Sequence, residues 1–312
     1  MTGRAPLVRV YWYSQTGQLK ETVDAFVGPL ADAGWRVDRR QVVPKEDYPF
    51  PWSARRFVSV LTEAADRSTV SDVSIEHGGA VEDDRAPDLV VYAFQVWYLA
   101  PSVPMRSVLV RFADEFAGVP VIGLTACRNM WYSAAVAVRR QVNQVGGRYL
   151  GTVAAIDDAP PAATFVTTLR WLLTGRREPF SVFPRAGVGP EQLARVRAAG
   201  EAVAEATADA GGALADRVPG ALRRSDAAVV DQTIAAADLL AGRFFGVWAR
   251  LAKAARPGVP RRLVLVAFLC WLFGSVLFGL PVVALVRKLA GRRFDRALRR
   301  ALAPVLAAEA KS

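Results

Sequence analysis

The residues best suited to chemistry form a short polar stretch near the N-terminus, Ser14-Gln15-Thr16-Gly17-Gln18-Leu19. The run before it is rich in β-branched and aromatic residues and predicts a strand. From Leu19 onward, apolar residues recur at helical spacing. A strand, a tight turn and a helix aim unpaired backbone N–H groups and the positive helix end at one point. Hydroxyls at Ser14 and Thr16 add donors and Gly17 permits close approach, so the stretch predicts a phosphate-binding loop.

The spacing of this loop separates it from two other phosphate sites. It lacks the Gly-Lys-Ser/Thr of a Walker loop and the Gly-x-Gly-x-x-Gly of a dinucleotide site. It resembles the FMN-phosphate loop of flavodoxins, in which a hydroxyl residue, a spacer, Thr-Gly and another polar residue follow the first strand. The alternative is an ordinary strand-to-helix turn.

Two further polar or aromatic segments follow buried strands. Gln95-Val96-Trp97-Tyr98 comes after the apolar run 88–94, and Cys127-Arg128-Asn129 comes after the run 119–126. Trp97 and Tyr98 are expected to form the walls of a site for a flat ring, or else to be core residues. Arg128 carries a permanent planar charge suited to an enolate or carbonyl oxygen, and Asn129 suits a substrate carbonyl. Cys127 has no histidine to activate it, which favours a role as a small strand-end residue over a nucleophile.

Strands alternate with helices over the first 156 residues, which predicts a doubly wound parallel sheet of five strands. Ligands of such sheets bind beyond the carboxyl ends of the strands, where the three segments above would meet. Asp157 and Asp158 follow the fifth strand at the same edge. They are candidate proton acceptors, or else helix-cap or solvated residues.

The composition narrows the classes of function. Forty Lys and Arg against twenty-nine Asp and Glu give a formal net charge of +11, which indicates an anionic partner. Because no nucleic-acid motif is present and the basic residues crowd the C-terminus, a membrane is favoured over nucleic acid. The single histidine, His77, lies in a polar stretch predicted as a loop, so a histidine-based triad, a metal site or a Cys-His-Asn condensing site is not expected. The two cysteines fit a reducing cytosol.

The segment 263–286 contains no charged residue. Its twenty-four positions span about 36 Å as a helix, enough to cross a hydrocarbon core of about 30 Å. Both flanks are basic, so a single span competes with a re-entrant anchor bent at Gly274, Gly279 or Pro281. We expect three parts: a flavodoxin-like domain over 1–158, a helical extension over 159–255, and a membrane anchor with its tail over 256–312. The helix expected over 226–255 is either amphipathic at a bilayer or part of a packed bundle.

Taken together, four motifs resemble the flavodoxin-like proteins of dialkylresorcinol and aryl-polyene gene clusters, often labelled dialkylresorcinol condensing enzymes. They are the loop 13–19, Tyr48-Pro49-Phe50-Pro51-Trp52, the segment 95–102 and Cys127-Arg128-Asn129-Met130-Trp131. The resemblance covers residues 7–190. It implies FMN, a partner ketosynthase and a long-chain cyclohexane-1,3-dione as the hydrophobic substrate.

With one histidine, the chain suits aromatisation of that dione to a dialkylresorcinol better than condensation, with Arg128 and Asn129 as catalytic residues and FMN as oxidant. We expect an enzyme on the cytoplasmic face of the membrane, anchored by 263–286, and leave a homodimer open. A quinone reductase or electron carrier at the membrane is one alternative. A flavin-free scaffold is another, because Gln18 replaces the Thr common at that point of the flavodoxin loop.

Overall fold

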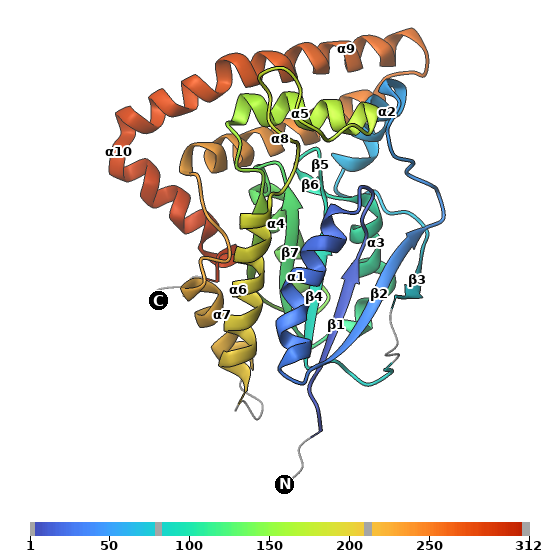
Figure 1. The fold of residues 1–312 in the computed structure, drawn as a ribbon. Helices are drawn as coiled ribbons and strands as arrows, with labels where there is room; N and C mark the ends of the chain where they lie inside the picture. Colours follow the sequence, from blue (N-terminus) through green and yellow to red (C-terminus); the bar gives the residue numbers. More distant parts are fainter. Residues whose placement is uncertain (1–3, 79–82, 209–213, 308–312) are drawn as a thin grey trace.

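The protein, seen in a computed structural model that describes residues 4–78, 83–208 and 214–307, is built around a six-stranded sheet (Figure 1). The strand order is β3-β2-β1-β4-β7-β8. Their bounds are Leu7–Trp12 for β1, Arg36–Pro44 for β2, Val73–His77 for β3, Leu89–Phe94 for β4, Pro120–Cys127 for β7 and Arg148–Ile156 for β8. Two short strands, β5 (Val96–Trp97) and β6 (Ala100–Pro101), pair with each other outside this sheet.

Five of the six strands are parallel, and their order β2-β1-β4-β7-β8 is that of a flavodoxin-like sheet, as predicted. The prediction of only five strands is wrong, because β3 adds an antiparallel edge strand next to β2. His77 therefore lies at the end of a strand, opposite Arg40, and not in a loop. This strand has a weak sequence signal, because an edge strand with one half-buried face needs only two apolar residues, Val73 and Ile75.

Helices cover both faces of the sheet. On one face, α1 (Gln18–Asp32), α6 (Pro190–Thr207) and α7 (Leu214–Arg224) pack on the strands around Val23, Phe26 and Val203. On the other face, α2 (Ala54–Ala64), α3 (Val103–Arg111) and α4 (Tyr132–Gln144) pack around Tyr92 and Val138. The result is a three-layer arrangement in which the strands at the centre are buried on both sides, as their continuous apolar sequences require.

A further helical layer lies across the carboxyl ends of the strands (Figure 1). It consists of α5 (Pro161–Thr174), α8 (Gln232–Ala254) and a long helix made of α9 (Val259–Gly274), a π-helical turn (Ser275–Gly279) and α10 (Leu280–Leu302). The chain expected to be helical from residue 226 begins its helix only at Gln232, where Asp231 caps α8 by accepting from the N–H groups of Thr233 and Ile234. This helical layer, made of α5, α8 and the long helix, covers the edge at which ligands of such sheets bind.

The helical layer is joined to the sheet domain by a buried polar contact and by an exposed ion pair, both made by α8. Asp238 of α8 accepts hydrogen bonds from the backbone N–H groups of Tyr132 (3.1 Å) and Ser133 (2.9 Å), so it caps the N-terminus of α4 from outside. At the far end of α8, Lys253 pairs with Asp66, which follows α2. The helix α8 is therefore packed on the domain along its length. This agrees with the alternative in which the helix expected over 226–255 is part of a packed bundle.

The long apolar helix continues through Gly274, Gly279 and Pro281, with the π-helical turn at Ser275–Gly279, and leaves helical backbone geometry at Gly291, where φ is 51°. After the bend the chain returns to the sheet domain. Leu298, Leu302 and Val305 are buried in its core, and Thr152 Oγ1 donates to the carbonyl of Val305 (2.8 Å). Both flanks of the apolar segment thus pack against the same body. The final residues of the expected tail lie outside the described part of the chain.

Candidate functional site

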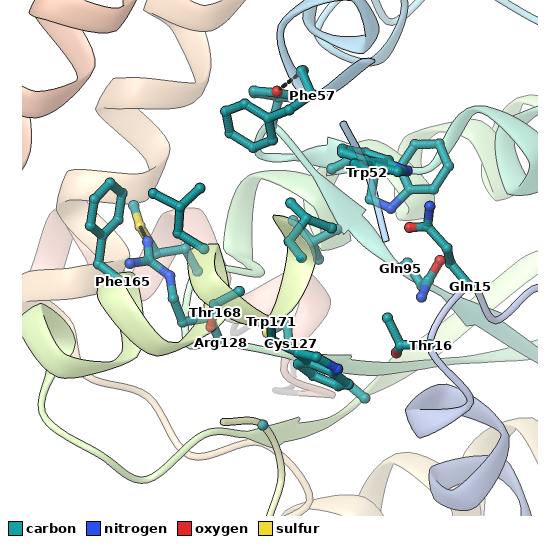
Figure 2. A pocket seen from close by; sticks show the side chains of 18 of the residues that line it. Gln15, Thr16, Trp52, Phe57, Gln95, Cys127, Arg128, Phe165, Thr168 and Trp171 are labelled. Atoms are coloured by element: carbon teal, nitrogen blue, oxygen red, sulfur yellow. Dashed lines mark hydrogen bonds between the residues drawn. The ribbon is translucent and has the colours of Figure 1, made fainter. Parts of the chain in front are cut away.

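A cavity of about 280 Å³ lies at the carboxyl ends of β1, β4 and β7. Its walls come from the loops that follow these strands, from the segment 50–57 and from α5, which closes it from above. Figure 2 shows Gln15, Thr16 and Gln95 on one side and Arg128 beside Phe165 on the other. Most of the lining is apolar or aromatic, the character expected of a site for a flat organic ring.

Nine of the thirteen residues expected in the site line this cavity: Gln15, Thr16, Gln18, Gln95, Val96, Trp97, Tyr98, Cys127 and Arg128. Four others do not contribute to its wall. The Ser14 hydroxyl is buried next to the loop with no hydrogen-bond partner among the described residues, and Gly17 forms the N-cap of α1. The Leu19 side chain belongs to the core, and Asn129 faces a neighbouring chamber.

The first turn of α1 forms the end of the cavity suited to an anion. Gly17 has a φ of 83°, a conformation that favours glycine, and no side chain caps the helix. The first backbone N–H groups of α1 are therefore available, as at other helix N-termini that bind phosphate. No acidic side chain occurs among the described residues that line the cavity. An anionic group there would meet donors and the positive helix end, and Glu21, the carboxylate in the first turn of α1, does not line the cavity.

Two glutamines of the loop hold it in place with their side chains. Gln15 donates from Nε2 to the carbonyls of Tyr48 (3.0 Å) and Pro49 (3.2 Å). The Gln18 side-chain oxygen accepts from Arg177 (2.8 Å) and from the backbone N–H of Val188 (2.7 Å). With both amides engaged, the backbone N–H groups of the first turn of α1 and the Thr16 hydroxyl are the donors left at this end of the cavity.

The segment 175–188, which sequence reasoning did not place at the site, closes over the loop. Gly187 has a φ of 90°, and a Cβ there would lie 2.5 Å from the end of the Gln18 amide. Arg177 stands 3.9 Å from Glu21 in the first turn of α1 and donates from Nε to the carbonyl of Ala186 (3.0 Å). The sequence shows the basic pair Arg176-Arg177, but it does not show that this segment packs against the start of α1, because that contact depends on tertiary packing.

Aromatic rings form much of the wall. Trp97 packs against Tyr48 and Trp52, with ring centroids 4.9 and 5.4 Å apart, so it is both a core residue and a wall residue. Trp171 of α5, which the sequence did not single out, lines the cavity and packs edge-on against Phe50. Gln95 contributes a buried side-chain oxygen without a partner among the described residues. A planar ligand with hydrogen-bonding edges would satisfy such a wall.

The loop after β4 has an unusual backbone. Tyr98 and Leu99 both have positive φ, 49° and 59°, although neither is glycine. The Tyr98 hydroxyl donates to the carbonyl of Phe57, and its ring packs on Phe245 of α8. Residues held in this region cost about 1–3 kcal/mol each and cluster at ligand sites. In this conformation Tyr98 and Leu99 both line the cavity.

Arg128 is the one charged side chain among the described residues that line the cavity. It is half-buried, its guanidinium lies over the Phe165 ring at 5.3 Å from the centroid, and Nη2 is 3.3 Å from Met130 Sδ. No carboxylate within the described ranges comes within ion-pair distance of it. Burial lowers the pKa of Arg128 from its ordinary value of 12.5, yet a guanidinium stays protonated at neutral pH. The site therefore holds a cation without a counterion.

The other candidates for proton or nucleophilic chemistry are placed elsewhere. Burial raises the pKa of the Cys127 thiol to about 12, so at neutral pH it is no nucleophile, in line with the strand-end role. Asp157 accepts from the N–H groups of Gly187 (2.8 Å) and Ala159 (3.1 Å), and Asp158 accepts from Gln192 (2.6 Å). Neither aspartate lines the cavity. The alternative structural roles suit both aspartates better than proton transfer.

A second chamber of about 260 Å³ adjoins the first beneath α8 and α9. The two share six lining residues, namely Leu99, Arg128, Met130, Phe165, Phe245 and Leu272. Asn129 lines the second chamber only, and its side-chain oxygen is buried without a partner among the described residues. Arg128 thus stands at the boundary between a cavity walled by aromatic rings and a chamber walled by helices.

Solved structures of similar architecture include a flavoprotein from Lactobacillus acidophilus NCFM in complex with FMN. It is 14% identical over 48% of this chain and 93% of its own, with a TM-score of 0.36. A candidate flavoprotein from Bacteroides eggerthii DSM 20697 is 12% identical over 51% of this chain and 93% of its own, also with a TM-score of 0.36. No protein-family model and no curated protein matches the sequence. The flavodoxin-like fold is shown by the strand order of the chain itself.

Proposed function

We propose that this chain is a membrane-associated FMN-dependent oxidoreductase that aromatises a dialkyl cyclohexane-1,3-dione to a dialkylresorcinol. The observation that carries the proposal is Arg128, a cation without a counterion placed between an aromatic cavity and an apolar chamber. Such a position suits a substrate that has an anionic head and apolar tails.

The residues present fit FMN. The N–H groups at the start of α1, with the hydroxyls of Ser14 and Thr16, would hold the phosphate. Trp97, Trp52 and Trp171 would flank the ring, and the unpartnered oxygen of Gln95 would accept from its N–H edge. When bound, FMN supplies the hydride acceptor that aromatising such a ring requires, since the ring gives up one hydride and one proton.

The dione explains why the cavity needs a cation more than a base. A cyclohexane-1,3-dione is a vinylogous acid and ionises in water, so no protein carboxylate has to remove its first proton. Arg128 would bind the enolate oxygen and hold the substrate anion in place while the ring is oxidised. Asn129 would hold the second oxygen through its amide. A carboxylate in the wall would repel this substrate, and none is found among the described lining residues.

The apolar helix supports a place at the bilayer. It is long and apolar enough to cross a membrane by length and composition, and its outer residues are exposed, such as Leu263 (64%), Leu277 (66%) and Leu289 (78%). A crossing would put its flanks on opposite sides, whereas both flanks pack against one domain. We therefore propose that the helix lies parallel to the membrane plane at the cytoplasmic face, with its apolar face inserted into the lipid, instead of crossing the bilayer. A ketosynthase would supply the dione there.

The test uses the full chain purified in detergent, under anaerobic conditions. We expect bound FMN with an absorbance maximum at about 450 nm. A dialkyl cyclohexane-1,3-dione should bleach this absorbance, and NADPH should not. Arg128→Ala should slow bleaching by about 100-fold while FMN content stays unchanged. The exposed Arg176→Ala is the matched control and should bleach at the wild-type rate.

Other outcomes assign other functions. Bleaching by NADPH and not by the dione would make the protein a quinone reductase or electron carrier. A chain that takes up no FMN on reconstitution would be a scaffold. Loss of FMN from the Arg128→Ala variant would reassign Arg128 to cofactor binding.

A further inference from the structure

The chamber between α5, α8 and the long apolar helix has two unlike ends. Its inner end contains Arg128 and Asn129, the latter with a buried, unpartnered oxygen. Its outer end is formed by apolar residues that are also exposed on the protein surface, namely Leu240 (48%), Phe244 (46%) and Val282 (56%). The chamber therefore connects the polar junction with the apolar exterior.

The walls between these ends are apolar and come from two antiparallel helices. Ala237 and Ala241 line the chamber from α8, and Val276 and Val283 line it from the opposite helix. Small residues on α8 leave the space open, because larger side chains at these positions would fill it. The long helix is held over the chamber at its far end by Arg287, which donates to Gln232 (2.7 Å) and Thr233 (3.1 Å) at the start of α8.

We propose that this chamber binds an alkyl chain of the substrate, with its mouth on the membrane-facing surface and the polar head at Arg128. The inference rests on the proposed function for the identity of the head, but the chamber itself takes any straight hydrocarbon chain with an anionic end. Each additional methylene buried in the chamber should tighten binding about fourfold until the chain reaches the mouth.

The probe is a homologous series of n-alkyl carboxylates, competing with dansyl-undecanoate for the FMN-loaded chain in lipid nanodiscs, with empty nanodiscs subtracted. We expect the wild type to show the fourfold gain per methylene. Ala241→Trp should lower the affinity for the longer chains at least about tenfold and flatten the dependence on length, because the indole fills the chamber. Arg128→Ala should weaken every member of the series equally and leave the gain per methylene unchanged.

Ala254→Trp is the control, because Ala254 is exposed at the end of the same helix and should bind the series as the wild type does. Val283→Trp narrows the chamber from the other helix and covers the case in which Ala241→Trp fails to fold, which FMN content and circular dichroism report. Affinity that is independent of chain length, or unchanged in both tryptophan variants, would overturn the proposal. Since probe binding needs no turnover, a chain that binds alkyl carboxylates without oxidising diones would refute the proposed function alone.

Discussion

Burying part of a guanidinium without a carboxylate partner costs free energy that a bound anion can recover. Arg128 is in this position: among the described residues, its guanidinium contacts the Phe165 ring and the Met130 sulfur. Two other buried arginines have oxygen partners. Arg9 is paired with Asp38 at 2.7 Å, and Arg106 donates to the carbonyls of Asp66 and Glu63. Arg128 lines the cavity without such a partner, and at the scale of single residues this is the strongest indication of an anionic substrate.

Two hydroxyls are expected to contribute to cofactor affinity, because each can donate to the phosphate where backbone N–H groups already converge. Ser14→Ala and Thr16→Val should each weaken FMN binding about tenfold, the value of one hydrogen bond to a charged group. The measurement is fluorescence titration of the apoprotein with FMN. Thr62→Val on α2, whose hydroxyl bonds to the carbonyl of Ser59, is the control. Unchanged affinity in both loop variants would place the phosphate elsewhere.

The two cysteines should differ in reactivity. Burial raises the pKa of Cys127 to about 12, whereas Cys270 is exposed on α9. Since the thiolate is the reacting form, N-ethylmaleimide near neutral pH should modify Cys270 and leave Cys127 intact until the protein is unfolded. Mass spectrometry of peptides from the labelled protein measures this. We also expect Cys127→Ala to retain FMN and turnover within about twofold. Rapid labelling of Cys127 in the folded protein would show it to be an accessible, activated thiol.

At the scale of elements, the sheet could be predicted because its strands have sequences that only a two-sided core explains. The strand Leu89–Phe94 is apolar throughout, and parallel order then brings the three following loops to one edge. The helical layer over this edge could not be predicted in this way. Its placement depends on contacts such as Asp238 with the start of α4, between residues far apart in sequence. Trp171 and Gly187 likewise reach the cavity through contacts between residues far apart in sequence, Trp171 with Phe50 and Gly187 with Gln18.

The contact that holds α8 to α4 is expected to depend on pH. Burial raises the pKa of the Asp238 carboxyl to about 6, from 3.8, although the N–H groups of Tyr132 and Ser133 and the charge of Arg67 oppose the shift. As pH rises from about 4 to about 6, the unfolded chain loses this proton before the folded chain does, so the free energy of unfolding falls. The group contributes its full stabilisation below the lower pKa and loses it above the higher one.

Asp238→Asn should therefore remove this pH dependence. The wild type should lose on the order of 3 kcal/mol relative to the variant between about pH 4 and pH 6, and the difference should be constant above that window. Urea unfolding in detergent across this range measures both proteins. Asp231→Asn is a suitable control, since it changes the exposed cap of the same helix. Parallel curves for the wild type and Asp238→Asn would mean that folding does not raise the pKa of the Asp238 carboxyl.

At the scale of the whole molecule, charge and apolar surface lie together. The chain from 256 to 300 carries ten Lys and Arg and one acidic residue, Asp295, around the long apolar helix. Exposed apolar residues of α8 add to the same helical layer: Leu240, Phe244, Val247 and Leu251. An apolar surface rimmed by cations is typical of a protein seated on anionic lipid. Binding to vesicles with anionic lipid should exceed binding to neutral vesicles, and added salt should reduce the difference, as co-sedimentation would show.

The orientation of the helix follows from where its flanks are attached. The chain before it is attached through the ion pair of Lys253 with Asp66, and the chain after it is attached through the buried Leu298 and Leu302. A crossing would therefore require one flank to detach from the domain. In a Cys270→Ser background, Arg256→Cys and Arg292→Cys place a thiol on each exposed flank. If the helix lies in the plane of the lipid, a membrane-impermeant maleimide should label both thiols from outside sealed vesicles to which the protein was added. A crossing helix would leave one of them protected until the vesicles are permeabilised, and that result would require the C-terminal return to unfold from the domain on insertion.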